Sequence, residues 1–452
     1  MSTEKLRSKT IKWLVLGIPA ILLGTCVIGG VFAVQNSKNA RENELNLLAK
    51  AGLPRDYNDV KHTPDPEKDA GALLEQFDVA RRAAEKTDSS RKLAADRTGD
   101  TELRRSYLRE NEKLIQLQEQ ILAKPELATL TDPSKGTALL FPQLAPSKNT
   151  TRLALTQAEL LAADGKPSEA IQKLTSAVKF ASVVNTDSTL ITELVSIAMR
   201  AMTHRTAMLI FAEHSERADV RMAMDKYIKA AVPNVDMRRG LSSEVALAIA
   251  SEESMRSGKL SLQELTGTAS DNDQVNSNVR TIEKIITLPG VREMLFTRLY
   301  RHYRQMYESI PADRQKQRER IAAAQAADTE VDGMNRTTDF MVQMFTPLFK
   351  QAFQAEAKTI AEWRSLNAIL VAAEIKAMTG RYPAKLPISG PESIDPFTDK
   401  PLFYKATDNS VKVYSVGADG NDNGGLLFRP TKGRSPEYDS GYGIPYTVPK
   451  RS

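Results

Sequence analysis

A short segment near the C-terminal end, rich in Asp, Asn and Gly, carries the clearest pattern that could bind a ligand. Asp419, Asn421 and Asn423 occupy alternate positions, and Gly424 follows them. Alternation lets three side-chain oxygens converge on one point, and the glycine permits the sharp turn that calcium loops need. The pattern predicts a Ca²⁺ site, and a polar turn without a metal is the alternative.

This segment does not fit an EF-hand. The residue eleven positions after Asp419 is Pro430, where an EF-hand has a bidentate glutamate, and the segment follows a predicted strand rather than a helix. Acidic residues nearby in the sequence, Asp422, Glu437 or Asp439, would have to complete the ligand shell. The predicted metal ligands are therefore Asp419, Asn421, Asp422, Asn423 and Asp439.

Histidine and cysteine are sparse, with four and one in the chain. The histidines have no metal-ligand spacing, and the single cysteine, Cys26, lies inside an apolar stretch, so the rest of the chain can form no internal disulfide. The four histidines are His62, His204, His214 and His302. We therefore expect a non-enzymatic protein, with an exported hydrolase that has an unrecognised site as the alternative.

The residues around the predicted calcium segment carry a family resemblance. A predicted long helix ends at Gly380, and Tyr382-Pro383, Asp395-Pro396-Phe397 and the run from Tyr414 to Gly420 follow it, with Gly424-Gly425 behind. This part resembles the C-terminal half of the major pseudopilins of type II secretion systems. The resemblance implies a small antiparallel sheet on a long helix and a calcium-binding loop. A component of a secretion or pilus-like machine is a further alternative for the function.

The resemblance is limited to this part of the chain. In pseudopilins the membrane segment begins the long helix itself, whereas here the apolar stretch ends at Val34 and the long helix begins near Thr346. The resemblance therefore implies a fold and a metal rather than a place in a filament. The layout of the whole chain also resembles that of bacterial exported proteins that are anchored in the membrane.

The C-terminal composition predicts the elements that position the loop. Of the 23 glycines and 22 prolines, 9 of each lie after Thr379, which is typical of short strands and turns. Residues 401–405 and 411–416 are predicted strands, joined by a hairpin at 407–410. Thr346 is predicted to cap a helix with Pro347 at its first position, and this helix would run to Thr379. Residues 346–452 therefore form one predicted module.

Residues 35–345 are predicted to form an exported helical domain, because Ala, Leu, Glu, Lys, Arg and Gln dominate them. Its clearest unit is a helix at 153–163, a turn at 164–167 and a second helix capped by Ser168, which resembles one tetratricopeptide hairpin. A third helix at 190–214 would pack behind this hairpin.

Three further segments of this domain have a predicted structure. A helix from about Asp69 would bury Leu73, Leu74, Phe77 and Val79, and residues 131–149, which contain three prolines, would form a loop. Residues 291–307 interleave aromatic and basic side chains, a pattern found in nucleic-acid-binding proteins. In an exported protein we expect these aromatics to pack inward with arginine stems beside them, so no nucleic-acid partner is predicted.

The N-terminal region predicts a membrane anchor. The 22 residues of 13–34 carry no charged side chain and would span roughly 33 Å as a helix, close to the thickness of the hydrocarbon layer. Residues 1–12 hold four basic side chains, which predicts that they stay in the cytoplasm while the rest is exported. Cleavage as a signal peptide after Val31-Phe32-Ala33 and a lipoprotein signal at Cys26 are the alternatives.

The charge balance suggests no polyanionic partner, because the net charge is only +6 and acidic and basic residues alternate along most of the chain. The predicted fold is mainly α: a transmembrane helix, a helical bundle with a tetratricopeptide-like hairpin, and a small antiparallel β module on a long helix. The predicted protein is a single-pass protein of the bacterial cell membrane with a periplasmic body that binds a protein partner.

Overall fold

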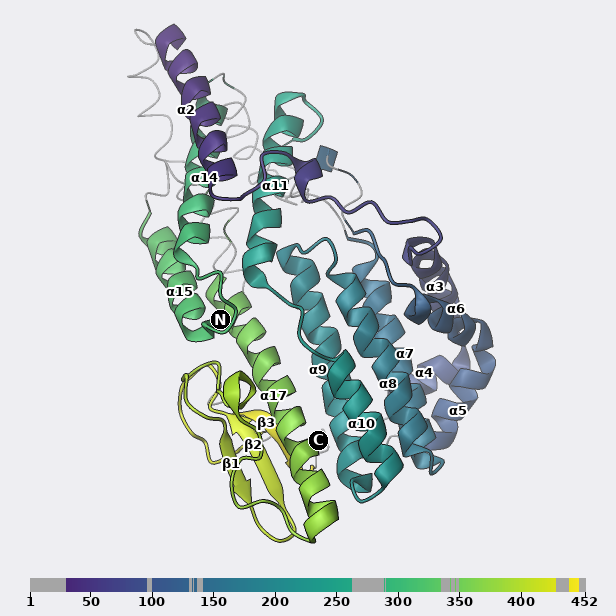
Figure 1. The fold of residues 1–452 in the computed structure, drawn as a ribbon. Helices are drawn as coiled ribbons and strands as arrows, with labels where there is room; N and C mark the ends of the chain where they lie inside the picture. The colour runs from purple at the N-terminus through teal and green to yellow at the C-terminus, as the bar shows by residue number, and fades with distance from the viewer. Residues whose placement is uncertain are drawn as a thin grey trace.

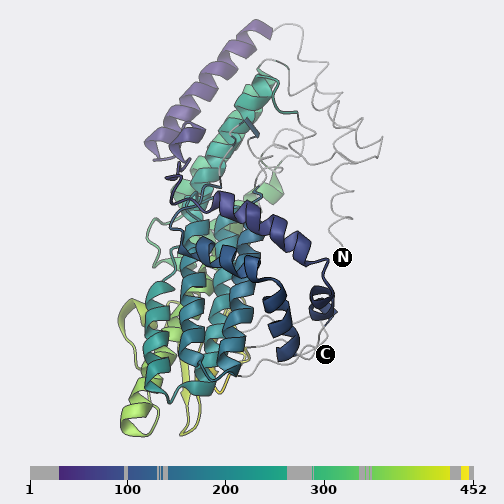
Figure 2. The ribbon, with the colours of Figure 1, turned by 90° about the vertical axis from the view of Figure 1, so that its right-hand side faces the viewer.

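The computed structural model describes residues 30–95, 100–129, 132, 134–135, 141–261, 288, 290–334, 342, 346, 349–427 and 439–446. This part is mainly helical, with one three-stranded antiparallel sheet, as the sequence predicted. Figure 1 shows an elongated arrangement in which α2, α11 and α14 lie at one end and the sheet lies at the other; Figure 2 shows the same separation from the side.

The first end is built around α2 (Gly30–Lys50), α11 (Met237–Arg256), α14 (Val291–Ser309) and α15 (Gln317–Gly333). Helix α2 packs along α14, and α14 packs on α11 and α15. The aromatics of α14 point inward, as predicted: Phe296, Tyr300 and Tyr303 are buried in one apolar cluster. The short 3₁₀ helix η1 (Tyr57–Asp59) follows α2 and contacts α11.

The middle is a bundle of α7 (Leu144–Ala163), α8 (Pro167–Val184), α9 (Leu190–His214) and α10 (Ala218–Ala230). The predicted hairpin is present as α7 and α8, and α9 has the predicted bounds and packs on α8. The predicted loop at 131–149 is wrong from Leu144 onward, because α7 accommodates Pro146 in its first turn, where the missing N–H needs no partner. Ser168 is not a cap, since Lys166 precedes the first residue of α8.

Four shorter helices lie beside this bundle: α3 (Gly71–Ala84), α4 (Asp88–Ala95), α5 (Thr101–Glu110) and α6 (Glu112–Ala123). Leu74 and Phe77 of α3 are buried as predicted, but Val79 is 71% exposed. The prediction for Val79 was wrong because two residues advance a helix by about 200°, which carries Val79 to the face opposite Phe77.

The long helix α17 (Phe349–Thr379) connects the two ends of the molecule. Its first turns join the apolar cluster of α11 and α14, whereas its later turns join the cluster of α8, α9, α10 and the sheet. The Thr346 hydroxyl, which was predicted to cap this helix, has no hydrogen-bond partner among the described residues, and the predicted first position, Pro347, lies outside them. The N–H groups of Phe349 and Lys350 donate to the Asp328 carboxylate of α15 at 3.0 and 2.9 Å. Gly380 ends the helix with φ +82°.

The sheet has the order β1-β2-β3, with β1 (Phe403–Ala406), β2 (Val411–Ser415) and β3 (Ser440–Ile444). The predicted hairpin is confirmed: Phe403 pairs with Tyr414, and the N–H of Thr407 donates to the carbonyl of Ser410 at 2.8 Å. Both β2 and β3 pack on α17. The 3₁₀ helix η3 (Gly390–Ser393) lies between α17 and β1.

The predicted membrane segment at 13–34 falls almost wholly outside the described residues. Among the helices that the structure does describe, no stretch is long and apolar enough to cross a bilayer. The membrane anchor therefore stays a prediction from the sequence.

Candidate functional site

The predicted calcium segment is a tight turn after β2, and backbone N–H groups occupy several of its carboxylate oxygens. The Asn421 N–H donates to Asp419 Oδ1 at 3.0 Å. Asp422 Oδ1 accepts the Gly424 N–H at 2.8 Å and the Tyr414 hydroxyl at 3.0 Å. Asn421 and Asp422 are exposed, whereas Asp419 and Asn423 are half-buried.

Asp439 closes the turn from the start of β3, where its side chain is buried. Its carboxylate accepts the N–H groups of Asn423, Gly425 and Leu426 at 3.2, 2.7 and 3.2 Å. The structure thus brings Asp439 to the segment at 419–424, as the sequence predicted. A carboxylate that accepts three N–H groups holds the turn without needing a cation.

The metal assignment itself stays a prediction. Among the described residues, no group of three or more histidine, cysteine or acidic side chains lies close enough together to hold an ion. Asparagine does not count toward such a group. Ca²⁺ also binds amide and backbone carbonyl oxygens, and Asn421 and Asn423 carry both. Gly425 also restricts the turn, because a Cβ at this position would come within 2.9 Å of the Tyr414 ring.

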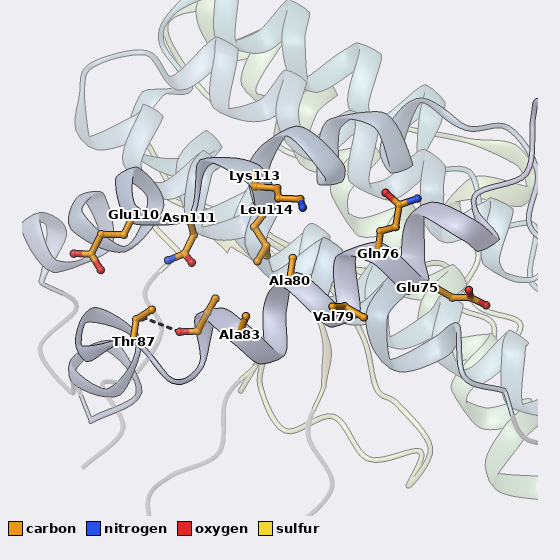
Figure 3. Close-up of a pocket in the computed structure, with 11 residues that line it drawn as sticks. Glu75, Gln76, Val79, Ala80, Ala83, Thr87, Glu110, Asn111, Lys113 and Leu114 are labelled. Carbon is orange, nitrogen blue, oxygen red and sulfur yellow. Dashed lines mark hydrogen bonds between the residues drawn. The ribbon is translucent and has the colours of Figure 1, made fainter.

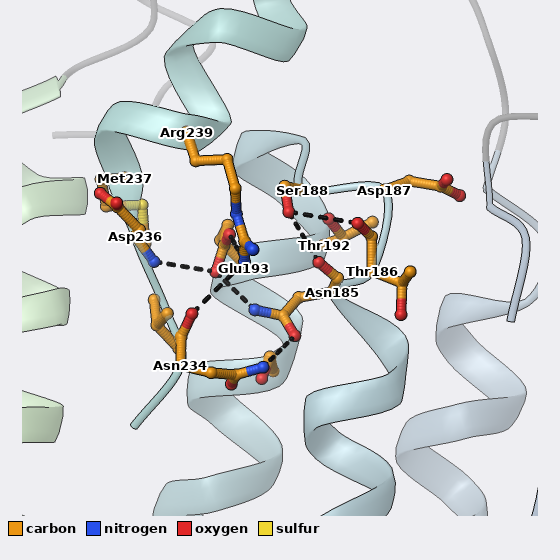
Figure 4. A network of polar contacts seen from close by, with 12 residues as sticks. Asn185, Thr186, Asp187, Ser188, Thr192, Glu193, Asn234, Asp236, Met237 and Arg239 are labelled. Atoms are coloured by element: carbon orange, nitrogen blue, oxygen red, sulfur yellow. Dashed lines mark hydrogen bonds and ion pairs between the residues drawn. The ribbon is translucent and has the colours of Figure 1, made fainter. Parts of the chain in front are cut away.

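A second candidate is a buried polar network where α9 and α11 begin (Figure 4). Glu193 of α9 has no exposed surface, and it accepts the Asn185 amide at 2.8 Å and the Arg239 guanidinium at 3.0 Å. The N–H of Asp236 donates to the same carboxylate at 3.3 Å. Burial raises the pKa of Glu193 to about 7, although Arg239 opposes this shift.

The network continues through Asp236 to α15 and α17. Arg320 is fully buried and pairs with both Asp236 and Glu356, the latter at 2.8 Å. Glu356 also accepts the Met237 N–H at 2.9 Å and the Gln317 amide at 3.0 Å. Four helices are thereby joined by charged groups whose oxygens already have donors. This arrangement holds the four helices in register.

The same end of the bundle is tied to the N-terminal segments by Asp187. Its carboxylate accepts the His62 N–H at 3.1 Å, and it accepts both the N–H and the hydroxyl of Thr129. Ser188, next to it, has φ 49°, a conformation that side chains rarely adopt. The strained turn between α8 and α9 therefore serves to hold loops from two distant parts of the chain.

The third candidate is an open groove between α3 and α5–α6, with a volume of 710 Å³ (Figure 3). Val79, Ala80 and Ala83 of α3 line one side, and Leu114 of α6 lies at the base with 3% exposure. Polar side chains form the rim: Glu75, Gln76, Glu110, Asn111 and Lys113. The groove therefore has an apolar floor and a polar rim.

The sequence reasoning missed both the polar network and the groove. Glu193, Arg200 and Glu356 interrupt otherwise apolar helix faces, and this could have marked them as buried polar residues. Their partners lie 36 or more residues away in cases such as Arg320 with Glu356, so no local spacing identifies the pairs. The groove was missed because Val79, which lines it, was predicted to be buried.

Comparison of the chain with protein-family models, with curated proteins and with solved structures found no match in any of the three.

Proposed function

We propose that this chain is a non-enzymatic, single-pass protein of the bacterial cell envelope, whose exported body is a docking scaffold for a protein partner. The observation that carries the docking role is the groove between α3 and α6. Its exposed Val79, apolar floor and charged rim fit the apolar face of an amphipathic helix, which needs one buried stripe and polar flanks.

The sequence supports the anchor. A stretch of 22 uncharged residues follows four basic side chains, and α2 begins within the last residues of this stretch. A helix that continues out of the bilayer into the body needs no flexible linker. The proposed tetratricopeptide-like character of α7 and α8 agrees with a docking role, because such hairpins commonly serve as binding scaffolds.

The docking role is tested with a photo-crosslinking amino acid at Val79 of the full chain in its native membranes. The matched control carries it at Met222 of α10, which is 62% exposed but lies outside the groove. We expect one discrete protein adduct from position 79, weakened several-fold by Ala83→Glu in the same groove. Equal labelling from positions 79 and 222, or no protein adduct from position 79, contradicts the proposal.

The calcium role belongs to the same proposal and has its own test. Thermal unfolding of the full chain is compared in Ca²⁺ and in chelator, because a ligand that binds only the folded state raises the midpoint. We expect a rise that the double substitution Asp419→Ala and Asn421→Ala abolishes. An unchanged midpoint contradicts the calcium site and leaves the docking proposal intact.

A further inference from the structure

The end of the molecule formed by α2, α11 and α14 has an exposed surface of apolar and basic side chains. These side chains lie at similar positions along the helix axes. Val34 of α2 lies against Gly290, just before α14: a Cβ on Gly290 would be 3.2 Å from the Val34 Cα. The first turn of α14 is therefore level with the last residue of the predicted membrane segment.

Ion pairs fix the relative heights of the three helices along this end. Glu44 of α2 accepts Arg304 of α14 at 2.7 Å and Arg301 at 3.4 Å. Arg41, one turn nearer to Val34, pairs with Glu252 of α11 at 2.7 Å, and Glu252 also accepts the Tyr300 hydroxyl at 2.6 Å. Glu44 and Glu252 are both buried, so α2 is a fixed part of the body.

The rise per residue of an α-helix gives the distance of each of these residues from Val34 along the helix axis. Arg41 lies roughly 10 Å from Val34 along α2, and Arg256 lies about 6 Å beyond Glu252 toward the same end. Arg256 and the following Lys259 therefore reach to within roughly 5 Å of the level of Val34, and Lys38 lies about 6 Å from that level. All three of these side chains are exposed.

Two apolar side chains lie at the same end. Leu288 is 44% exposed and adjoins the Gly290 turn, and Met294, in the first turn of α14, is 42% exposed. Glu253, also at this end, is an exposed acidic residue. Apolar side chains that lie beside lysine and arginine at the level of the phosphates form the usual arrangement of a membrane-contacting surface.

We propose that this end, defined by Lys38, Arg256, Lys259, Leu288 and Met294, rests on the phosphate-bearing surface of a phospholipid bilayer. The inference rests on the proposed membrane anchor and adds the orientation of the body to it. Helix α2 then stands upright from the membrane, and the sheet lies with the C-terminal end of α17 at the opposite end of the described structure (Figure 1).

The test uses the full chain with Cys26→Ser, reconstituted in nanodiscs that contain anionic phospholipid. An environment-sensitive fluorophore is attached at Met294→Cys or, as the matched control, at Asp408→Cys in the exposed β1–β2 hairpin. Lipids with a quencher near the headgroup are expected to quench position 294 at least twofold more than position 408. Reversing Lys38, Arg256 and Lys259 to Glu is expected to remove most of this difference.

Reversal of three exposed basic residues elsewhere, Arg109, Lys179 and Lys226, is the control for net charge and should leave the difference unchanged. Equal quenching at positions 294 and 408 in a chain that still co-purifies with the nanodiscs overturns the proposed orientation but leaves the anchor standing. A chain that does not enter nanodiscs overturns both.

Discussion

At the residue scale, the polar groups that matter most for stability are buried carboxylates. Their oxygens accept hydrogen bonds from other segments of the chain. Burial alone makes an ionised carboxylate unfavourable, so such a group either acquires donors or binds its proton more tightly. The carboxylate of Asp439 accepts hydrogen bonds from three N–H groups. The carboxylate of Glu193 accepts hydrogen bonds from three donors and also binds its proton more tightly, since its pKa is raised to about 7.

The raised pKa of Glu193 predicts a specific pH dependence of stability. Because the folded protein holds this proton more tightly than the unfolded chain, the contribution is complete below about pH 4.5 and is lost as the pH rises through about 7. Glu193→Gln removes the titration, so the free-energy difference between wild type and variant should shrink by roughly 1 kcal/mol or more between pH 5 and pH 8. Urea unfolding at both pH values measures this. A difference that grows with pH would contradict the assignment.

Asp439 should be necessary for the turn after β2. Asp439→Ala removes the acceptor of three N–H groups and should cost about 2 kcal/mol of stability. Hydrogen exchange should accelerate at Asn423, Gly425 and Leu426, which donate to this carboxylate. Asp419→Ala, the control, removes one donor–acceptor contact within the turn and should leave these three amides protected. Unchanged exchange in Asp439→Ala would show that the carboxylate does not hold the turn.

At the element scale, helices with local end signals could be predicted from the sequence, and helices fixed by distant partners could not. The start of α9 was predictable because Thr189 accepts the Thr192 N–H, a cap within four residues. The start of α17 was not, because its first N–H groups donate to Asp328 on another helix. The β1–β2 hairpin was predictable from its turn residues, whereas β3 was not singled out.

The same distinction applies to the candidate sites. The sequence named Asp422, Glu437 and Asp439 as residues that could complete a ligand shell with the segment at 419–424, and the structure places Asp439 against that segment. The ion pairs of α2 had no such signal. Arg41 and Glu252 are 211 positions apart, and only the packing of α2 with α11 and α14 brings them together.

The attachment of α2 to the body should depend on Glu44. Glu44→Gln removes a buried carboxylate from Arg304, whose side chain is 15% exposed, and from Arg301, whose side chain is 52% exposed. The loss should cost about 2 kcal/mol, and most of it should come from the less exposed pair with Arg304. Glu42→Gln is the control, because its pair with Arg55 is exposed and should be worth less than about 1 kcal/mol. Chemical unfolding of the full chain in detergent compares the two. Equal effects would mean that the ion pairs of Glu44 do not hold α2 on the body.

At the scale of the whole molecule, the described residues form an elongated body with its predicted anchor at one end and its sheet at the other. Helix α17 links both ends, because its first turns join the cluster around α14 and its later turns carry the sheet. The groove between α3 and α6 lies to the side of this axis. Such a layout suits a protein that holds a partner at a set distance from a membrane.

The central claim is that the N-terminal segment stays in the bilayer and exports everything that follows it. Fusion of a phosphatase that is active only outside the cytoplasm, after Ser452 of the full chain, tests this claim most directly. We predict an active phosphatase in the membrane fraction. When a fluorescent protein that matures only in the cytoplasm replaces the phosphatase, we predict no fluorescence. An inactive phosphatase together with a fluorescent partner fusion would place the body in the cytoplasm and contradict the account.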